Sequence, residues 1–214
     1  MAKNFISNKD ETVRMFKSNF MEMFSKVHFT VPLYIYIPVI AYLIYRSVAV
    51  YSLPFSYIIG LLVTGIFIWT FSEYILHRFV FHFPVKTNFG KRIKFIFHGV
   101  HHDYPSDRKR LVMPPSASIP LALIFFLLFW LIFGNVYMLP FFSGFLIGYL
   151  FYDMTHYAVH HFNIHNKFWL MIKNHHIRHH FKEEDKGYGV SSPFWDIVFR
   201  TGFEEKESSY KQQI

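Results

Sequence analysis

Four apolar runs divide the sequence into segments of membrane length and polar connections. The first runs from Val31 to Val50 and the second covers residues 53–76, and each is long enough to cross the roughly 30 Å hydrocarbon core of a bilayer as a helix. The third and fourth cover residues 119–133 and 136–152, with only the dipeptide Gly-Asn at 134–135 between them. This short link predicts a tight helical hairpin. The pattern as a whole predicts an all-α integral membrane protein with four transmembrane helices.

The two ends of the chain are polar. Residues 1–30 are basic, but large apolar side chains recur at roughly helical spacing between Phe16 and Phe24. This spacing predicts a short amphipathic segment on the membrane surface rather than a loosely ordered tail. The start of the chain lacks the apolar core of a signal peptide. Residues 204–214 are expected to form a polar tail, which leaves residues 31–203 as one membrane domain.

The distribution of basic side chains predicts the orientation. Of the 22 Lys and Arg residues, five precede the first apolar run, eight lie between the second and third runs, and eight follow the fourth. The positive-inside rule therefore places both termini and the middle connection in the cytoplasm. We expect a multi-pass protein of an endoplasmic reticulum membrane or a bacterial inner membrane. The net charge of +8 lies in loops that flank apolar runs, which favours a membrane surface over nucleic acid as the partner.

Histidine is the residue type that suggests chemistry. The chain has 14 His and no Cys, so any metal ion must be held by His, Asp or Glu. Four tight clusters contain most of them: HRFVFH from residue 77, HGVHH from 98, HYAVHH from 156 and HHIRHH from 175. All four lie on the predicted cytoplasmic side. We therefore expect a His-rich helical cap on that face of the membrane.

Ten of these histidines have the spacing of metal ligands. Three pairs lie four residues apart and so share a helix face: His98 and His102, His156 and His160, His176 and His180. His101 and His179 lie three residues after the first member of their pair and widen the same face. His77 and His82 are five apart and converge only if the helix loosens or if they bind different ions. A lone histidine on an apolar helix is usually a hydrogen-bonded structural residue, but ten imidazoles at these spacings favour a dimetal centre with about five nitrogens per ion.

Four further residues are candidates to orient the ligands from behind. Glu73 precedes the first cluster by four residues, and Asp153 precedes the third by three. Either carboxylate can accept a hydrogen bond from the ring nitrogen that faces away from the metal. The alternative is that Glu73 only reaches toward the headgroups and that Asp153 caps a helix. His161 and His175 each stand next to a predicted ligand and are candidates for the same supporting role.

The motifs around these residues resemble those of a known superfamily. The segments are EYILHRFVFH (73–82), HGVHHDYPSDRKRLVMPP (98–115), YDMTHYAVHH (152–161) and HHIRHHFKEEDKGYGVSSPFWDIVFRTGF (175–203). The chain resembles the membrane fatty acid hydroxylase superfamily, which also contains sterol desaturases, and whose pattern is HxxxxH, HxxHH, HxxxHH and HxxHH in this order. The segments RLVMPP and GYGV…FWD are most similar to the fatty acid 2-hydroxylase branch. The resemblance covers roughly residues 69–203.

The resemblance implies a di-iron centre, O2 as co-substrate and a fatty acyl substrate, either free or within a ceramide-like lipid. It implies ligand roles for His77, His82, His98, His101, His102, His156, His160, His176, His179 and His180. Zinc can replace iron in such a nitrogen-rich site. Many relatives carry a fused cytochrome b5 domain with a His-Pro-Gly-Gly haem segment, which this sequence does not contain. We therefore expect electrons from a separate donor such as cytochrome b5 or ferredoxin.

The chemistry of the substrate leads to the same expectation. An alkyl C–H bond offers acid–base groups nothing to act on, so its oxidation requires a metal that activates O2. The predicted reaction is hydroxylation of carbon 2 of a long acyl chain. One alternative is a carotenoid or sterol hydroxylase or desaturase of the same superfamily. Another is a His-rich membrane protein that binds or transports metal, which is disfavoured because the apolar runs place no charge at mid-membrane.

Overall fold

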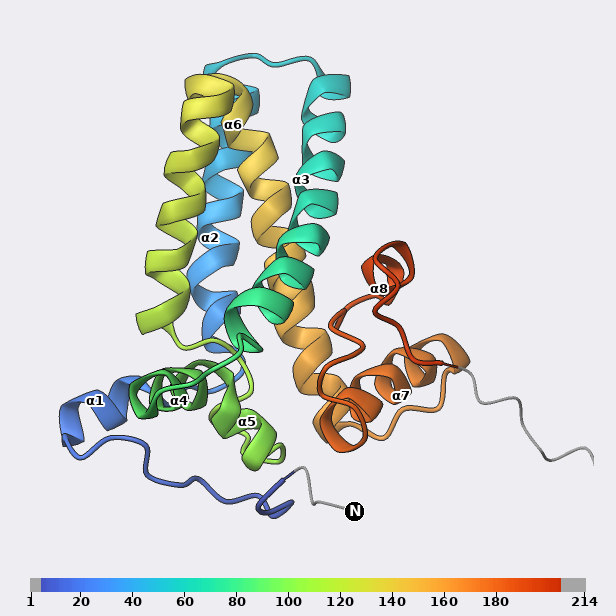
Figure 1. Cartoon of the computed structure of the whole chain (residues 1–214). Coiled ribbons are helices and arrows are strands. Elements are labelled where there is room, and N and C mark those ends of the chain that lie inside the picture. Colours follow the sequence, from blue (N-terminus) through green and yellow to red (C-terminus); the bar gives the residue numbers. More distant parts are fainter. Residues whose placement is uncertain (1–4, 205–214) are drawn as a thin grey trace, which may run out of the picture.

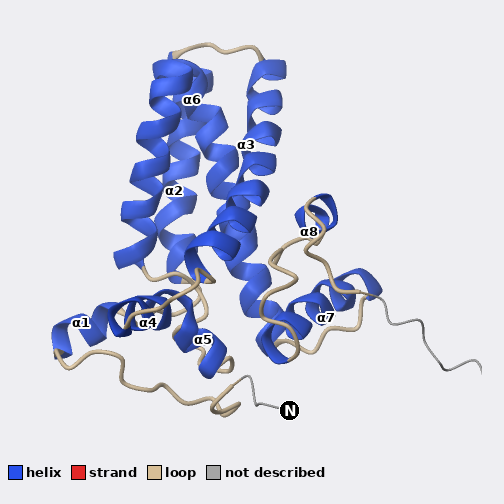
Figure 2. Ribbon diagram, viewed as in Figure 1, coloured by secondary structure: helices blue, strands red, loops and turns tan. Residues whose placement is uncertain are grey.

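The computed structural model describes residues 5–204, and within this range the regular structure is helical, without a strand (Figure 2). The helices, in chain order, are α1 (Asn19–Phe24), α2 (Val31–Tyr45), η1 (Arg46–Val50), α3 (Phe55–Ile75), η2 (Leu76–Phe81), α4 (Asn88–Lys94), η3 (Phe95–Gly99), α5 (Val100–Asp103), α6 (Pro115–His161), α7 (Lys167–Phe181) and α8 (Phe194–Val198). The η elements are π-helical turns that continue the preceding α-helix. The all-α prediction is therefore confirmed for the described residues.

Three stretches of helix in the described range are long and apolar enough to cross a membrane: Val31–Val50, Phe55–Phe81 and Pro115–His161. The third is interrupted at Gly134, whose φ of 66° and ψ of −170° are not helical. Figure 1 shows that the two arms of α6 on either side of this break run antiparallel. Ring contacts between the arms, such as Phe133 with Phe141 at 4.5 Å, agree with this arrangement. The predicted hairpin turn thus lies at Gly134, where the positive φ favours a residue without a Cβ.

The backbones of helices α3 and α6 approach each other closely at two glycines. A Cβ on Gly65 would lie 2.0 Å from the carbonyl oxygen of Phe141, and one on Gly144 would lie 2.0 Å from that of Leu62. Both distances are far below a van der Waals contact. The two helices can therefore approach this closely only because both positions are glycine.

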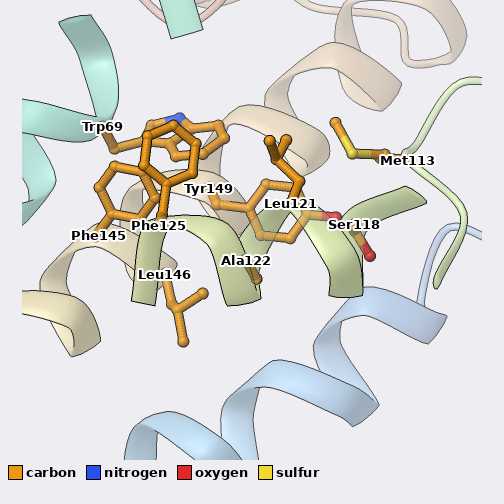
Figure 3. A pocket seen from close by; sticks show the side chains of 9 residues that line it. All are labelled: Trp69, Met113, Ser118, Leu121, Ala122, Phe125, Phe145, Leu146 and Tyr149. Carbon is orange, nitrogen blue, oxygen red and sulfur yellow. The ribbon is translucent and has the colours of Figure 1, made fainter. Parts of the chain in front are cut away.

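The interior of the bundle is aromatic. Figure 3 shows a small void beside Tyr149, lined by Trp69, Phe145, Ser118 and five other side chains. Its volume is about 10 Å³, which is near the space that one water molecule needs. The indole of Trp69 lies edge-on to Phe145 at 5.0 Å, and Tyr36 donates a hydrogen bond of 3.0 Å to Ser118. The bundle core is thus well packed and has no room for an acyl chain at this place.

The remaining helices form a cap at one end of the bundle (Figure 1). Helices α1, α4 and α5 lie below α2 and α3, and α7 and α8 lie beside the second arm of α6. Helix α8 also packs against α3, since Trp195 donates a hydrogen bond of 3.0 Å to the hydroxyl of Thr70 and contacts the ring of Phe71. The cap is therefore attached to the bundle on both sides.

The N-terminal segment is mostly not helical. Within the predicted amphipathic segment at 1–30, residues 1–4 lie outside the described range, and the helix is limited to Asn19–Phe24. Phe20, Met21, Met23 and Phe24 of this helix are exposed, as expected for a membrane surface. The residues before this helix run along the cap. The backbone N–H of Ile6 donates a hydrogen bond to the carbonyl of Asp103 at 2.9 Å. The predicted tail at 204–214 lies outside the described residues except for Glu204.

A buried ion pair attaches the N-terminal segment to the rest of the cap. The guanidinium of Arg110 lies 2.6 Å from the carboxylate of Glu22, and both side chains are at most 8 % exposed. The carboxylate also accepts hydrogen bonds of 2.9 Å from the N–H groups of Met15 and Phe16. Burial raises the pKa of Glu22, but Lys26, these two N–H groups and Arg110 lower it to about 2. Glu22 is therefore a charged anchor for residues 5–30.

Candidate metal centre

The structure gathers the ten predicted ligands into two groups of five at the junction of the cap and the bundle. The His77 cluster consists of His77, His82, His98, His102 and His179. The His101 cluster consists of His101, His156, His160, His176 and His180. Within each cluster, one nitrogen from every ring lies within 4.8 Å of the others. No other group of three or more His, Cys, Asp or Glu side chains in the described range has this geometry.

The nitrogen separations fit a coordination sphere. In the His77 cluster, the Nε2 atoms of His77 and His98 are 3.0 Å apart, and those of His82 and His179 are 3.1 Å apart. The His101 cluster has Nε2 contacts of 2.8 to 3.0 Å. Nitrogens that lie about 2.1 Å from one metal ion are about 3 Å apart when adjacent and about 4.2 Å apart when opposite. The donor set of each cluster therefore fits a metal ion with five nitrogen ligands.

A π-helical turn explains how His77 and His82 reach the same cluster. His77 lies within η2 and His82 caps its C-terminal end, and the N–H of His82 donates to the carbonyl of His77 at 3.1 Å, which is the i to i+5 bond of a π-helix. One extra residue in the turn brings positions five apart onto one face. Of the two arrangements that the sequence left open, the loosened helix is the one found.

Both members of each pair four residues apart belong to the same cluster, but the histidine that lies between them in the sequence can belong to the other cluster. His98 and His102 belong to the His77 cluster, whereas His101, three residues after His98, belongs to the other. Likewise, His179 joins the His77 cluster, whereas His176 and His180 of the same helix do not. The expectation that His101 and His179 widen the face of their own pair was therefore wrong. Helices α5 and α7 instead lie between the two clusters and give histidines to both.

The rings are held neutral by their surroundings. Burial lowers the pKa well below its ordinary value, and neighbouring imidazoles lower it further, for His98, His101, His102, His176 and His180. The pKa of His179 falls to about 4, because burial outweighs the hydrogen bond to the carbonyl of Lys186. A neutral imidazole keeps a lone pair for a metal ion. These rings are therefore in the protonation state that metal binding requires.

Two ligands of the His77 cluster are oriented by backbone carbonyl groups. The Nδ1 atom of His77 donates to the carbonyl of Tyr188 at 2.5 Å, and Nδ1 of His179 donates to that of Lys186 at 2.7 Å. A carbonyl oxygen can only accept, so the proton is on Nδ1 and the lone pair is on Nε2. Both acceptors belong to residues 186–191, which we call the carbonyl loop.

Buried carboxylates hold the carbonyl loop in place. Glu73 accepts hydrogen bonds from the N–H groups of Val190 and Ser191 at 2.7 and 2.8 Å. It therefore supports the ligands through this loop, and not through a ring nitrogen as the sequence suggested. Asp196 accepts from the N–H groups of Tyr188 and Gly189 at 2.9 and 2.8 Å.

The other three supporting candidates have different positions. His175 lies 3.1 Å from the carboxylate of Asp196, which in turn binds the N–H groups of the carbonyl loop. Asp153 is fully buried, and its Oδ1 lies 3.4 Å from the N–H of Met113. The ring of His161 lies 4.7 Å from that of Tyr157 at an angle of 39°, and its buried Nε2 has no partner in the described range. Only His175 thus contacts the network that orients the ligands.

Asp196 is a supporting residue that the spacing of side chains along the sequence does not indicate. Hydrogen bonds from His175, Gly189, Thr201 and Tyr188 lower the pKa of Asp196 even though burial raises it, so this carboxylate is charged. In the sequence, Asp196 stood out only as part of the segment GYGV…FWD, which resembles the family. The resemblance alone did not explain why an aspartate is needed there. The structure supplies that reason, because Asp196 fixes the loop that orients His77.

A large apolar cavity reaches both clusters. Its volume is about 490 Å³, and its walls include His98 of one cluster and His101 and His156 of the other. From there it follows the first arm of α6 past Ala117 to Ile124. Met15 and Arg110 complete one wall, so the N-terminal segment contributes to the cavity. The cavity is therefore placed to hold an apolar chain with one part beside the imidazoles.

The fold and the site together define a class of protein. The described chain is a helical protein with apolar helices of membrane length and two adjoining histidine clusters that fit metal ions. The sequence model for fatty acid hydroxylase matches residues 62–201. The chain belongs to the fatty acid hydroxylase family.

Individual relatives agree with this assignment. The chain is 42 % identical over 193 residues to a dihydroceramide fatty acyl 2-hydroxylase of Arabidopsis thaliana, an alignment that covers 89 % of this chain and 80 % of the relative. It is 37 % identical to the fatty acid 2-hydroxylase of Rattus norvegicus, over 88 % of this chain and 56 % of that one. The chain therefore spans little more than half the length of the rat relative.

A solved structure shares the fold. The hydroxylase domain of full-length scs7p superposes with a TM-score of 0.82 at 34 % identity, over 87 % of this chain and 70 % of that one. The similarity extends over the bundle and the cap, and supports the same family assignment.

Proposed function

We propose that this protein is a membrane-bound oxygenase that hydroxylates carbon 2 of a long-chain fatty acyl group, either free or within a ceramide-like lipid. The names of the relatives as fatty acid 2-hydroxylase and dihydroceramide fatty acyl 2-hydroxylase support this reaction. The observation that carries the proposal is the apolar cavity, which borders His98, His101 and His156 and so brings a lipid chain to both clusters.

The ten clustered histidines are the proposed ligands of two iron ions, which zinc can replace in a purified sample. The two sets of five converging nitrogens support two ions. When bound, iron supplies the activation of O2 that cleavage of an alkyl C–H bond requires. The imidazoles are ready to bind it, because burial keeps them neutral and because the Nδ1 protons of His77 and His179 are directed away from the cluster centre.

The chain's own residues position the substrate and exclude water. The acyl chain lies along Leu121 and Ile124, whose apolar surfaces favour a hydrocarbon over water. With the chain held, the carbon beside the carbonyl group faces the histidines. Because the acyl carbon is held beside the histidines, the reaction becomes effectively intramolecular.

We further propose four membrane spans, namely α2 with η1, α3 with η2, and the two arms of α6. The cap and both termini then lie in the cytoplasm, because the basic connections fall on one side. Residues 31–203 form the hydroxylase domain and residues 1–30 an N-terminal segment attached through Glu22. The membrane is the endoplasmic reticulum membrane or a bacterial inner membrane.

The proposed electron donor is a separate protein such as cytochrome b5 or ferredoxin. An opening of about 290 Å³ reaches His82, His98 and His102 from outside, and Lys91, Lys94, Asp103 and Glu184 are among the residues that border it. The net charge of +8, which lies in the connections on the proposed cytoplasmic side, supports an acidic donor. Nucleic acid is not among the proposed partners.

An isotope experiment tests the reaction. The purified full chain in detergent, loaded with ferrous iron and supplied with a reductant, is given a ceramide or a free long-chain acid under ¹⁸O2. We expect one ¹⁸O atom in a hydroxyl group at carbon 2. Label derived from water would contradict the oxygenase reaction. Label in a sterol or carotenoid, with acyl chains unchanged, would contradict the substrate and favour a sterol or carotenoid hydroxylase.

A further inference from the structure

The carbonyl loop contacts the two histidine clusters unequally. The carbonyl groups of Tyr188 and Lys186 accept from His77 and His179, which are both members of the His77 cluster. In the His101 cluster, the buried Nδ1 atoms of His101, His156, His176 and His180 have no hydrogen-bond partner among residues 5–204. In the His77 cluster, the buried Nδ1 of His102 also has no partner among the described residues. The carbonyl loop therefore fixes ring orientation and tautomer for two rings of the His77 cluster, and for none of these four rings of the His101 cluster.

The loop that provides these carbonyl groups is rigidly held. Its backbone N–H groups at 188 and 189 donate to the buried carboxylate of Asp196, and those at 190 and 191 donate to that of Glu73. The hydroxyl of Ser191 also donates to Glu73 at 2.5 Å. Four consecutive N–H groups are thus bound by two carboxylates that are 4 % and 0 % exposed.

The two carboxylates are themselves anchored in different parts of the fold. Glu73 belongs to α3 of the bundle, and Asp196 belongs to α8 of the cap. Asp196 is further fixed by the hydroxyl of Thr201, which donates at 2.7 Å, and by His175 at 3.1 Å. A displacement of either carboxylate therefore moves the loop and the two carbonyl groups that face His77 and His179.

We propose that Glu73 and Asp196 are positioning residues that act through the carbonyl loop, and that they make the His77 cluster the tighter of two unequal metal sites. This inference rests on the proposed dimetal centre. Groups that orient a ligand histidine from behind typically change metal affinity by about 10- to 100-fold. Loss of either carboxylate should therefore weaken one site by this factor and leave the other unchanged.

Zinc titration of the metal-free full chain in detergent, in competition with a chromophoric chelator, tests this inference. For the unsubstituted chain we expect two Zn²⁺ per chain with unequal affinities. Asp196→Asn and Glu73→Gln should raise the dissociation constant of the tighter site by about 10- to 100-fold. Ser191→Ala removes a single hydrogen bond to Glu73, so it should raise the same dissociation constant by a smaller factor. This variant replaces Glu73→Gln if that chain does not fold.

Combining Asp196→Asn with a ligand substitution in either cluster shows which metal site Asp196→Asn weakens. With His160→Ala, the His101 cluster lacks a ligand, and Asp196→Asn should still weaken the remaining site. With His82→Ala, the His77 cluster lacks a ligand, and Asp196→Asn should have no further effect. Asp185→Asn is the matched control, because Asp185 is an exposed carboxylate beside the same loop, and it should leave both sites unchanged.

The outcomes separate this inference from the proposed metal centre. If the unsubstituted chain binds no more than one Zn²⁺, the dimetal centre itself is wrong. If it binds two and Asp196→Asn weakens both equally or neither, only the positioning role is wrong. Equal weakening of both sites would indicate that Asp196 merely stabilises the fold.

Discussion

His101 and His102 are consecutive residues of α5, yet their rings belong to different histidine clusters. Successive side chains on a helix point about 100° apart, so a single turn of helix between the clusters can supply both. Both rings are buried, at 4 % and 6 % exposure. The separation of the two sites is therefore set by one short stretch of backbone.

This relationship predicts that His101→Ala and His102→Ala each abolish turnover but remove different metal ions. Each variant lacks one ligand in one cluster, and we expect losses above the roughly 100-fold typical of residues that only orient a ligand. Metal content measured by mass spectrometry should fall toward one ion per chain in both. His165→Ala, at an exposed position outside the clusters, should keep full activity and both ions. Full activity of either cluster variant would contradict the ligand assignment.

The apolar cavity predicts a change in chain-length preference. Ala117 lines the cavity on the first arm of α6, and Ala117→Trp places an indole where the acyl chain lies. We expect kcat/KM for the longest substrates to fall by about tenfold or more relative to short ones, since misfit in an apolar pocket costs about this much. Ala49→Trp, on the exposed face of η1, is the control. Equal effects on all chain lengths would mean that the substrate lies elsewhere.

The close contact of α3 and α6 predicts that Gly144→Ala destabilises the bundle. The added Cβ would lie 2.0 Å from the backbone carbonyl of Leu62, so the helices must move apart. Overpacking of this kind costs about 1–3 kcal/mol. Gly60→Ala, where a Cβ meets nothing within 4 Å, should leave the unfolding temperature in detergent unchanged or slightly higher. A lower midpoint for Gly60→Ala than for Gly144→Ala would contradict this packing.

The buried pair of Glu22 and Arg110 predicts an acid-sensitive attachment of the N-terminal segment. The folded pKa of Glu22, about 2, lies below its ordinary value of 4.5. Its stabilising effect is therefore complete above about pH 4.5 and is lost as the pH falls toward 2. Between pH 5 and pH 3, thermal stability should fall more in the unsubstituted chain than in Glu22→Gln, which does not titrate.

A surface pair provides the control for this experiment. Asp10 and Arg108 lie 2.9 Å apart, but both side chains are more than half exposed. Asp10→Asn should change stability by about 0–1 kcal/mol at either pH, as is usual for exposed pairs. Equal pH dependence of the unsubstituted chain and Glu22→Gln would show that the pair does not anchor the segment.

The sequence predicted the helices and the ten clustered histidines because both signals are local. Long apolar runs identify the bundle, and His pairs four residues apart identify shared helix faces. The assignment of His101 and His179 to a cluster was not predictable in this way. It depends on how α5 and α7 are inserted between the clusters, which is a tertiary property. The π-turn between His77 and His82 is likewise invisible in an apolar run, since one extra residue changes no side-chain type.

The carbonyl loop shows a second limit of sequence reasoning. Its contacts with His77 and His179 use backbone carbonyl groups, which every residue has, so residue type carries no signal. Glu73 was found because it precedes His77 by four residues and so shares a helix face with it. Asp196 was not, because it lies 16 residues beyond His180 and acts on backbone N–H groups. The N-terminal helix is shorter than the predicted segment. The polar groups of residues 5–13 bond to residues of the cap and not to one another within a helix.

The order of the ligands along the chain also determines when the centre can form during biosynthesis. The His77 cluster needs His179, and the His101 cluster needs His180, so translation must pass both arms of α6 before either set of ligands is complete. The bundle is thus synthesised and inserted ahead of any metal, and the ions join a chain already in its membrane.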